Sequence, residues 1–280
     1  MKTSFLITYC LLVFLNGFSQ VDFGVIQSIN KDTVLYANGY RFIEESIGNS
    51  FSPRNVNEAQ FKKNLERFRQ SKIKLYSCNI FIPGQLKLVG PAVNDIAVLG
   101  YVDTVLQRCK QAGVQLIVLG SGEARRIPVG YDSIKASNEF ILLARKMADL
   151  SAGYGITIAI ENLNHNETNF VLSISQAIDI VKAVNRPFFK LTADMYHMLV
   201  EDEPADVLFQ ASKLLVHCHI AEEVDRAYPG KTGVDFRPYF SAMKKIGYSG
   251  KIMIECRWND IDKESVVARQ YLLDQWNEAK

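Results

Sequence analysis

Eight short apolar runs alternate with segments of helical periodicity along this chain, and that alternation limits its fold more than any other feature. The apolar runs occupy residues 23–29, 40–46, 74–81, 114–120, 156–161, 188–194, 214–220 and 251–255. Helical segments lie between them, at residues 32–37, 57–72, 94–112, 132–151, 173–184, 204–214 and 235–248, and a further helix follows the last run. Strands joined by helical crossovers are parallel, and eight such units favour a closed barrel over an open doubly wound sheet. We therefore expect one closed α/β barrel over residues 20–280.

Four of the runs carry side chains that bind metals at or near their carboxyl ends: Glu161, Asp194, His219 and Glu255. Alternate residues of a strand point to opposite faces, and in each run the opposite phase is mostly apolar, as Ile158 and its neighbours show. The four polar side chains are therefore expected to point inward at the rim where barrels of this kind carry their chemistry. A single acid at a strand end often only caps a helix or pairs with lysine. Four in one phase on adjacent strands predict a shared divalent metal site.

The donor set also limits the metal. Three carboxylates and one imidazole suit Mn²⁺, Co²⁺ or Mg²⁺ better than a thiolate-preferring zinc site does. His217 shares the inward phase with His219 but lies two residues deeper. We therefore expect it to support the ligands from behind rather than to bind the ion.

Several segments together resemble a known family. IAIENLNHNE (158–167), LTADMYH (191–197), VHCHIAEEVDR (216–226) and MIE (253–255) are similar to the motifs of the xylose isomerase-like TIM barrels, also called the sugar phosphate isomerase/epimerase superfamily. Within it, the ketose 3-epimerases of the tagatose/psicose type are the most similar. The resemblance extends over nearly the whole chain from residue 20 onward, including GSGEARRIP at 120–128. It implies a single-domain (βα)8 TIM barrel.

The resemblance also implies roles for individual residues. It makes Glu161, Asp194, His219 and Glu255 the ligands of one divalent ion, Mn²⁺ first and Co²⁺ or Mg²⁺ as alternatives. Glu161 and Glu255 would also form the acid/base pair, and Glu167, His197 and Arg226 would contact the substrate. Arg226 lies one residue later than the family pattern expects, and Ala221 replaces the usual glycine. From its place at the end of the third run, Phe81 is expected to line the pocket, with packing in a loop or in the core as the alternative.

The resulting hypothesis is a metal-dependent sugar epimerase or isomerase. Removing a proton beside a ketone builds negative charge on oxygen, which a cation offsets. Carboxylates on both sides of the sugar would invert C3 through an enediolate, whereas one carboxylate moving the proton between carbons would interconvert aldose and ketose. A non-catalytic sugar-binding barrel is the alternative. The family also contains nucleases that cut abasic DNA and need a three-metal cluster. Four histidines are too few ligands for that cluster, and a net charge of +2 gives little attraction to DNA.

Residues 1–19 resemble a secretory signal peptide. An apolar stretch from Phe5 to Leu15 is too short to span a bilayer, and small residues precede a cleavage point before Gln20. We expect an exported protein, periplasmic or secreted, with no membrane attachment after cleavage. Export favours a non-phosphorylated keto-sugar or keto-glycoside. Arg125 and Arg126 could contact an anionic group, but arginines in a rim loop more often form solvated salt bridges. The sequence leaves open whether the chain is a homodimer or homotetramer.

Four cysteines remain after the proposed cleavage, at positions 78, 109, 218 and 256. Their wide spacing is unlike a disulfide framework, so buried free thiols are expected. A bridge between Cys218 and Cys256 stays open, because an oxidising compartment permits one.

Overall fold

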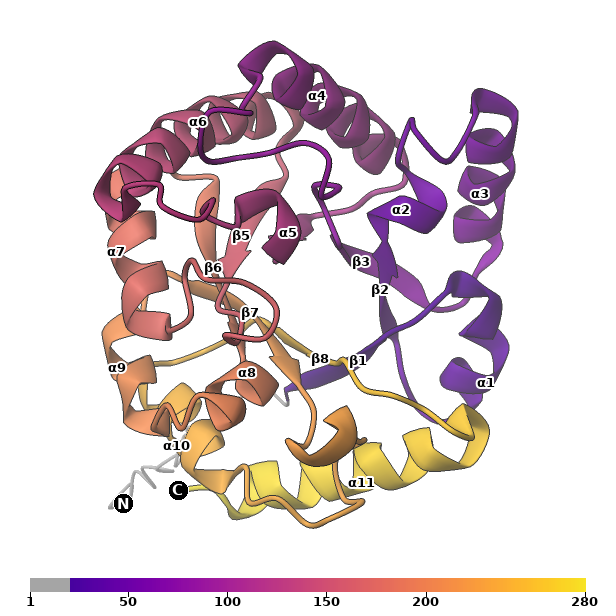
Figure 1. Ribbon diagram of the computed structural model, residues 1–280. Helices are drawn as coiled ribbons and strands as arrows, with labels where there is room; N and C mark the ends of the chain where they lie inside the picture. Colours follow the sequence, from indigo (N-terminus) through magenta and orange to yellow (C-terminus); the bar gives the residue numbers. More distant parts are fainter. Residues whose placement is uncertain (1–20) are drawn as a thin grey trace, which may run out of the picture.

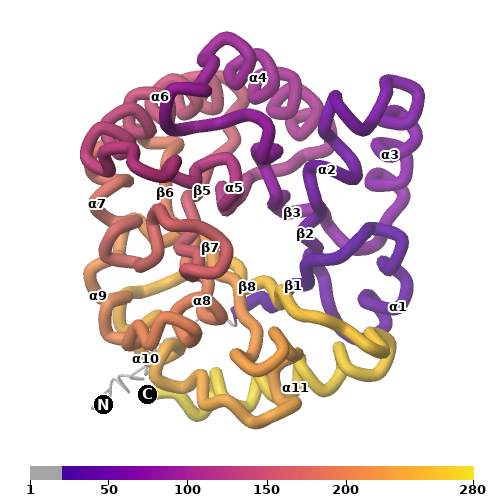
Figure 2. Tube along the Cα trace, viewed as in Figure 1, coloured from indigo at the N-terminus to yellow at the C-terminus, as the bar shows by residue number. Residues whose placement is uncertain are grey.

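The computed structural model describes residues 21–280 and contains a closed barrel of eight parallel strands in sequence order (Figure 1). The strands are β1 (Asp22–Ile26), β2 (Phe42–Ser46), β3 (Lys74–Asn79), β4 (Leu116–Leu119), β5 (Thr157–Glu161), β6 (Phe189–Asp194), β7 (Leu215–Ile220) and β8 (Lys251–Ile254). The barrel closes where β8 pairs with β1, with Asp22 opposite Lys251 and Val25 opposite Ile254. The two strands lie side by side near the centre of Figure 2. The predicted (βα)8 barrel is confirmed.

The α-helices of residues 21–280 are α1 (Asp32–Ala37), α2 (Ile47–Ser50), α3 (Glu58–Gln70), α4 (Asp95–Gln111), α5 (Gly122–Arg125), α6 (Ser133–Tyr154), α7 (Ile174–Val184), α8 (Met195–Val200), α9 (Leu208–Ala211), α10 (Arg237–Lys245) and α11 (Ile261–Glu278). Most of them form a ring outside the strands (Figure 1). Asn57, Asn94, Asp132 and Ser173 cap four of these helices by accepting a backbone N–H. Such capping residues explain why the starts of these helices could be predicted closely.

The strands separate two apolar layers, as their alternation predicts. Ile158 and Ile160 of β5 are completely buried in the large core between strands and helices. Ala159 faces the other way, into a small cluster with Leu116 and Val118 inside the barrel. The interior is therefore packed at this level, and the polar residues at the strand ends close it on one side.

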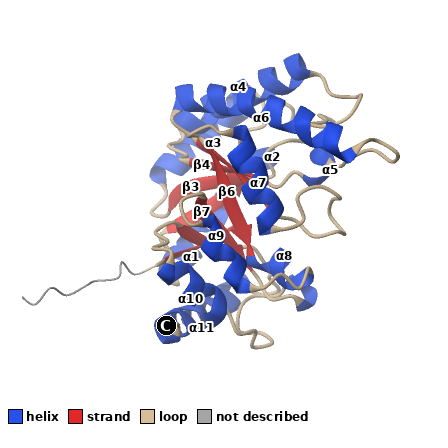
Figure 3. Cartoon of the chain, turned by 90° about the vertical axis from the view of Figure 1, so that its left-hand side faces the viewer, coloured by secondary structure: helices blue, strands red, loops and turns tan. Residues whose placement is uncertain are grey.

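One end of the barrel carries short helices and long connections. Figure 3 shows α5, α8 and several extended loops at the end toward which the strands run. Within residues 21–280 no helix is both long and apolar enough to cross a membrane. The predicted signal peptide, residues 1–19, lies outside the described residues.

The four cysteines at positions 78, 109, 218 and 256 are free thiols. Cys218 is buried among the residues of the outer core, and burial raises its pKa to about 12. The bridge to Cys256 that the sequence left open is not formed in the described chain.

Candidate active site

The four predicted ligands converge at the carboxyl end of the barrel. Glu161 and Asp194 are the last residues of β5 and β6, His219 is the fifth residue of β7, and Glu255 follows β8 directly. One ligand atom from each lies within 4.8 Å of the others. The Nδ1 atom of His219 is 2.6 Å from Oε1 of Glu161 and 3.0 Å from Oε2 of Glu255. One nitrogen of the imidazole therefore faces both carboxylates predicted to move protons.

The two carboxylate oxygens of Asp194 make different contacts: one caps a helix and the other faces the site. Its Oδ1 accepts the backbone N–H of Tyr196 at 2.8 Å and so caps α8. Its Oδ2 lies 3.4 Å from Nε2 of His197 and 3.5 Å from Nη2 of Arg226. Because the cap fixes the side chain, the second oxygen is held toward the other ligands.

The E-N-L-N segment after β5 positions its neighbours through its two asparagines. The Asn162 amide donates to the Asp194 carbonyl at 3.2 Å and accepts the Asp194 N–H at 2.9 Å, so it ties the ends of β5 and β6 together. Oδ1 of Asn164 accepts the N–H groups of Asn166 and Glu167, which forms a turn that directs Glu167 back toward the site. Both asparagines thus act on geometry rather than on substrate.

Arg226 reaches the site in spite of the extra residue before it. Asp225 and Arg226 both adopt left-handed backbone conformations, with φ of 60° and 49°. Non-glycine residues adopt this conformation rarely, and two in succession change the direction of the backbone before Ala227. The guanidinium then lies 2.8 Å from Glu255 and 3.1 Å from Glu167, with its carbon 4.5 Å from the centre of the Tyr196 ring. Arg226 therefore lies beside Glu255 and Glu167, and the substrate contact predicted for it stays a prediction.

His197 and Glu167 complete the group predicted to face substrate. Nε2 of His197 lies 4.0 Å from the carboxylate of Glu167, and neither ring nitrogen of His197 has a hydrogen-bond partner within residues 21–280. Burial lowers the pKa of His197. A neutral imidazole with two unused nitrogens is suited to contact sugar hydroxyls.

Glu44 is a buried member of the site that the sequence reasoning missed. Its Oε1 lies 3.0 Å from Nε2 of His219, and its Oε2 lies 2.8 Å from Nε2 of His217. Ser77 donates to the same carboxylate at 2.5 Å. His217 therefore stands behind His219 and reaches it through Glu44, as a supporting residue would. The available signal was a pair of adjacent acids, Glu44 and Glu45, directly after the apolar residues Phe42 and Ile43 of the second run.

The ionisation of these groups follows from burial and from crowding of charge. Burial raises the pKa of Glu161, and it raises the pKa of Asp194 to about 6, against the pull of Arg226. Burial acts the same way on Glu255, but His219 and Arg226 hold its pKa below the usual value. Burial disfavours charge on His219, yet the carboxylates around it raise its pKa well above the usual range. The site therefore favours positive charge at its centre.

A cavity of about 410 Å³ opens above these residues. Glu161, Glu167, His197, Arg226 and Glu255 all line it, together with backbone of the connections after β3 and β4. Gly120 and Gly122 are needed in that wall. A side chain at Gly120 would collide with the carboxylate of Glu161, and one at Gly122 would meet the Glu167 carbonyl.

Phe81 lies in the hydrophobic core and is completely buried, which differs from the pocket wall predicted for it. Ile80 and Ile82 on either side line the cavity instead. Ile80 has a left-handed backbone with φ of 51°. This conformation breaks the simple alternation of sides along the chain.

We expect Phe81→Ala to lower the free energy of unfolding by about 3 to 5 kcal/mol, because it removes a buried ring and leaves a cavity. Urea unfolding followed by circular dichroism measures it. Ile80→Ala is the control, because Ile80 is 60% exposed. Its effect should stay within about 0.5 kcal/mol, as is usual for surface substitutions. Equal stability of the two variants would contradict the core position of Phe81.

Comparison with known proteins now adds to this geometry. The sequence matches the family described as xylose isomerase-like TIM barrel over residues 34–274. The chain belongs to this family.

Three curated relatives are sugar epimerases or isomerases. A ketose 3-epimerase of Arthrobacter globiformis is 32% identical over 111 residues, which are 39% of this chain and 38% of the relative. L-ribulose 3-epimerase of Methylomonas sp. (strain DH-1) is 37% identical over 112 residues, 40% of this chain and 39% of the relative. Inosose isomerase of Bacillus licheniformis is 29% identical over 163 residues, 54% of this chain and 57% of the relative. The chain thus matches between two fifths and somewhat more than half of the length of these relatives.

Solved structures share the barrel over nearly its whole length. D-allulose 3-epimerase from Methylomonas sp., in complex with D-allulose, has a TM-score of 0.74 at 22% identity and covers 91% of this chain and 97% of its own. The 3-keto-D-glucoside 4-epimerase from E. coli has a TM-score of 0.74 at 17% identity, with 92% and 99% covered. The IolI protein with a bound zinc atom has a TM-score of 0.75 at 19% identity, with 93% and 99% covered. At such identities these likenesses establish the fold.

The residues of this xylose isomerase-like barrel fit a divalent metal. Glu161 Oε1 and His219 Nδ1 are buried and face each other, yet neither makes a well-aligned hydrogen bond. A cation between them and the other two carboxylates would satisfy these atoms and offset the crowded negative charge. Glu161, Asp194, His219 and Glu255 would hold it, and Glu44 would fix the far side of the His219 ring.

The two arginines after β4 serve the structure of this barrel. Arg125 is completely buried, and its Nη2 donates to the Glu161 carbonyl at 2.7 Å. Arg126 pairs with Glu123 at 2.9 Å and donates to the Glu167 carbonyl at 2.8 Å. Both therefore hold the backbone that carries the site, rather than facing an anion in the cavity.

Glu222, the acid of the H-x-H-x-x-E segment, organises the loop after β7. It is completely buried, and its carboxylate accepts N–H groups of Gly230, Thr232 and Gly233 at 2.6 to 3.1 Å. One carboxylate thus replaces the missing backbone partners of a whole turn. This explains why an acid occurs there without facing the substrate.

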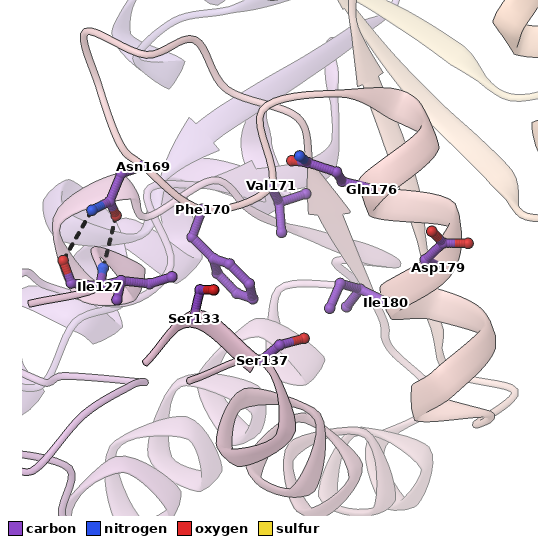
Figure 4. A pocket seen from close by; sticks show the side chains of 9 residues that line it. All are labelled: Ile127, Ser133, Ser137, Asn169, Phe170, Val171, Gln176, Asp179 and Ile180. Atoms are coloured by element: carbon purple, nitrogen blue, oxygen red, sulfur yellow. Dashed lines mark hydrogen bonds between the residues drawn. The ribbon is translucent and has the colours of Figure 1, made fainter. Parts of the chain in front are cut away.

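A separate groove of about 310 Å³ lies away from the barrel mouth, between α6 and the start of α7. Figure 4 shows the ring of Phe170 above Ser133 and Ser137, with Asn169 bonded to both backbone groups of Ile127. Its polar lining offers a single carboxylate, Asp179, and lacks the convergent ionisable groups of the barrel mouth. The mouth is therefore the candidate active site.

Proposed function

We propose that this chain is a divalent metal-dependent epimerase or isomerase of a non-phosphorylated keto-sugar or keto-glycoside. The observation that carries the proposal is that Glu161 and Glu255 both approach Nδ1 of His219, at 2.6 and 3.0 Å, beneath one cavity that both line. The similarity to ketose 3-epimerases and inosose isomerase supports the same class of reaction.

In the proposed reaction one carboxylate removes the proton from the carbon beside the ketone. The C–H electron pair moves toward the carbonyl oxygen and leaves an enediolate, and the second carboxylate returns a proton from the opposite side. The result is inversion at that carbon, which is C3 of a 2-ketose such as D-fructose and C2 or C4 of a glycoside oxidised at C3. A bound divalent ion, Mn²⁺ by preference, would offset the negative charge that develops on oxygen. Arg226, His197 and Glu167 orient the sugar hydroxyls above the pair.

Solvent-deuterium uptake tests this function directly. Metal-free protein, prepared with a chelator, is given D-fructose or methyl 3-keto-glucoside in deuterium oxide, and proton NMR follows the signal beside the ketone. We expect uptake only after Mn²⁺, Co²⁺ or Mg²⁺ is added back. Sugar binding without uptake for any metal and probe would instead favour a non-catalytic sugar-binding barrel.

Export belongs to the proposal as well, with cleavage before Gln20 and a mature protein in the periplasm or outside the cell. N-terminal sequencing of the protein purified from the native cell tests it. A mature chain that keeps Met1 would contradict it.

A further inference from the structure

The barrel mouth contains a second cavity beside the one already described. It measures about 330 Å³ and is lined by residues that follow β1, β2 and β8, among them Gln27, Ser46, Asn49 and Arg257. Each of the two cavities falls in the range of about 300 to 1,000 Å³ that is typical of small-molecule sites. A single monosaccharide ring above the carboxylates leaves the second cavity unexplained.

The two cavities share one boundary. Asn79, Ile80, Arg226 and Glu255 line both of them, so Glu255 stands where they meet. A ligand atom beside Glu255 therefore has polar space on two sides. This arrangement suits a substrate whose reacting ring is joined to a further group.

Asn79 and Ile80 form this boundary with unusual features. Asn79 is 4% exposed and its Oδ1 has no hydrogen-bond partner within residues 21–280, while its amide nitrogen lies 3.4 Å from Oε1 of Glu255. A buried acceptor without a partner is costly, and a ligand hydroxyl would satisfy it. Ile80 holds a left-handed conformation that a β-branched residue adopts only under constraint, and it exposes its aliphatic side chain between the cavities.

The walls of the second cavity are held in place by hydrogen bonds and carry polar side chains. Glu45 is buried and accepts the N–H groups of Ile29 and Ser46, each at 3.0 Å, so it fixes the loop after β1 to the end of β2. Arg257 is exposed, and its guanidinium forms no ion pair with any described residue. Amide, hydroxyl and guanidinium groups on a fixed frame match the hydroxyls of a sugar or polyol.

We propose that the substrate is a keto-glycoside of at least two units. The oxidised ring lies above Glu161 and Glu255, and the group on the other side of its glycosidic bond occupies the cavity of Asn49 and Arg257. The glycosidic linkage between the two units crosses the boundary at Asn79 and Ile80. The glycosidic bond stays intact during the reaction. This inference rests on the proposed function, because it takes the position of the reacting ring from it.

The test compares substrates of two lengths. Solvent-deuterium uptake is measured with Mn²⁺-loaded protein for methyl 3-keto-glucoside and for cellobiose oxidised at C3 of its non-reducing ring. The wild type should show a kcat/KM about tenfold higher for the disaccharide. Asn49→Trp places a large ring at the mouth of the second cavity and should reduce this ratio to about one. Asn138→Trp makes the same exchange on the exposed side of α6 and should leave the ratio unchanged.

The outcomes separate this inference from the function on which it rests. Exchange on the methyl glycoside with no advantage for the disaccharide overturns the second subsite alone. A disaccharide advantage that survives Asn49→Trp also overturns it. Exchange on neither glycoside but on D-fructose overturns the subsite alone, whereas exchange on none of the three overturns the proposed function together with it.

Discussion

Glu255→Gln is expected to lower the rate of deuterium uptake beside the ketone by about 10² to 10⁴-fold, the usual contribution of a positioned acid or base. The amide has nearly the shape of the carboxylate but cannot accept the proton. Glu255 lies 3.0 Å from His219 and 2.8 Å from Arg226, so its position is fixed from two sides. Proton NMR in deuterium oxide, at saturating Mn²⁺ and methyl 3-keto-glucoside, measures the loss.

Two measurements accompany that variant. Its Mn²⁺ affinity, determined by calorimetry, separates the loss of a ligand from the loss of a base. Glu66→Gln on the exposed face of α3 makes the same chemical change far from the mouth and should exchange at the wild-type rate. Unchanged uptake in Glu255→Gln would remove this residue from the mechanism.

Glu44→Gln is expected to weaken Mn²⁺ binding by about 10 to 100-fold, as loss of an outer partner of a metal-binding histidine usually does. Glu44 faces Nε2 of His219 at 3.0 Å, which leaves Nδ1 turned toward Glu161 and Glu255. The amide carries no charge and no longer favours this orientation of the ring. Isothermal titration calorimetry of metal-free protein with Mn²⁺ gives the change in Kd.

Glu45→Gln supplies the matched control, because Glu45 is also buried on β2 but bonds to the loop after β1. Its Mn²⁺ affinity should equal that of the wild type. Thermal unfolding of both variants shows whether either has lost its fold. The same Kd for Glu44→Gln and wild type would show that His219 is held by other contacts.

Most of the fold and the convergence of the four predicted ligands could be predicted from periodicity alone. Alternation along residues 156–161 assigned Glu161 and the aliphatic residues beside it to opposite faces, and the structure agrees. In a parallel barrel all strands end at the same rim, so strand-end residues such as Asp194 and Glu255 must approach each other. The alternation within each strand and the closure of the barrel were therefore enough to predict that these distant residues lie close together.

What the sequence hid depends on the backbone of loops or on partners across the barrel. Glu44 matters because His217 and His219 approach it from β7, and no local pattern on β2 indicates that contact. Arg226 lies at the site on a segment in which two successive residues take left-handed conformations, and no local sequence pattern indicates such a backbone. Phe81 was assigned to the wrong side because Ile80 takes such a conformation just before it.

The closing pair of strands has a consequence for biosynthesis. Asp22 and Lys251 lie opposite each other although 229 positions separate them, so β1 lacks its last neighbour until the residues of β8 have been synthesised. Until then β1 and β7 keep open edges, which favour pairing between nascent chains. Bringing such remote ends together also slows the final step of folding. A chaperone that binds the chain before β8 is in place would therefore shield the open edges of β1 and β7 from other chains.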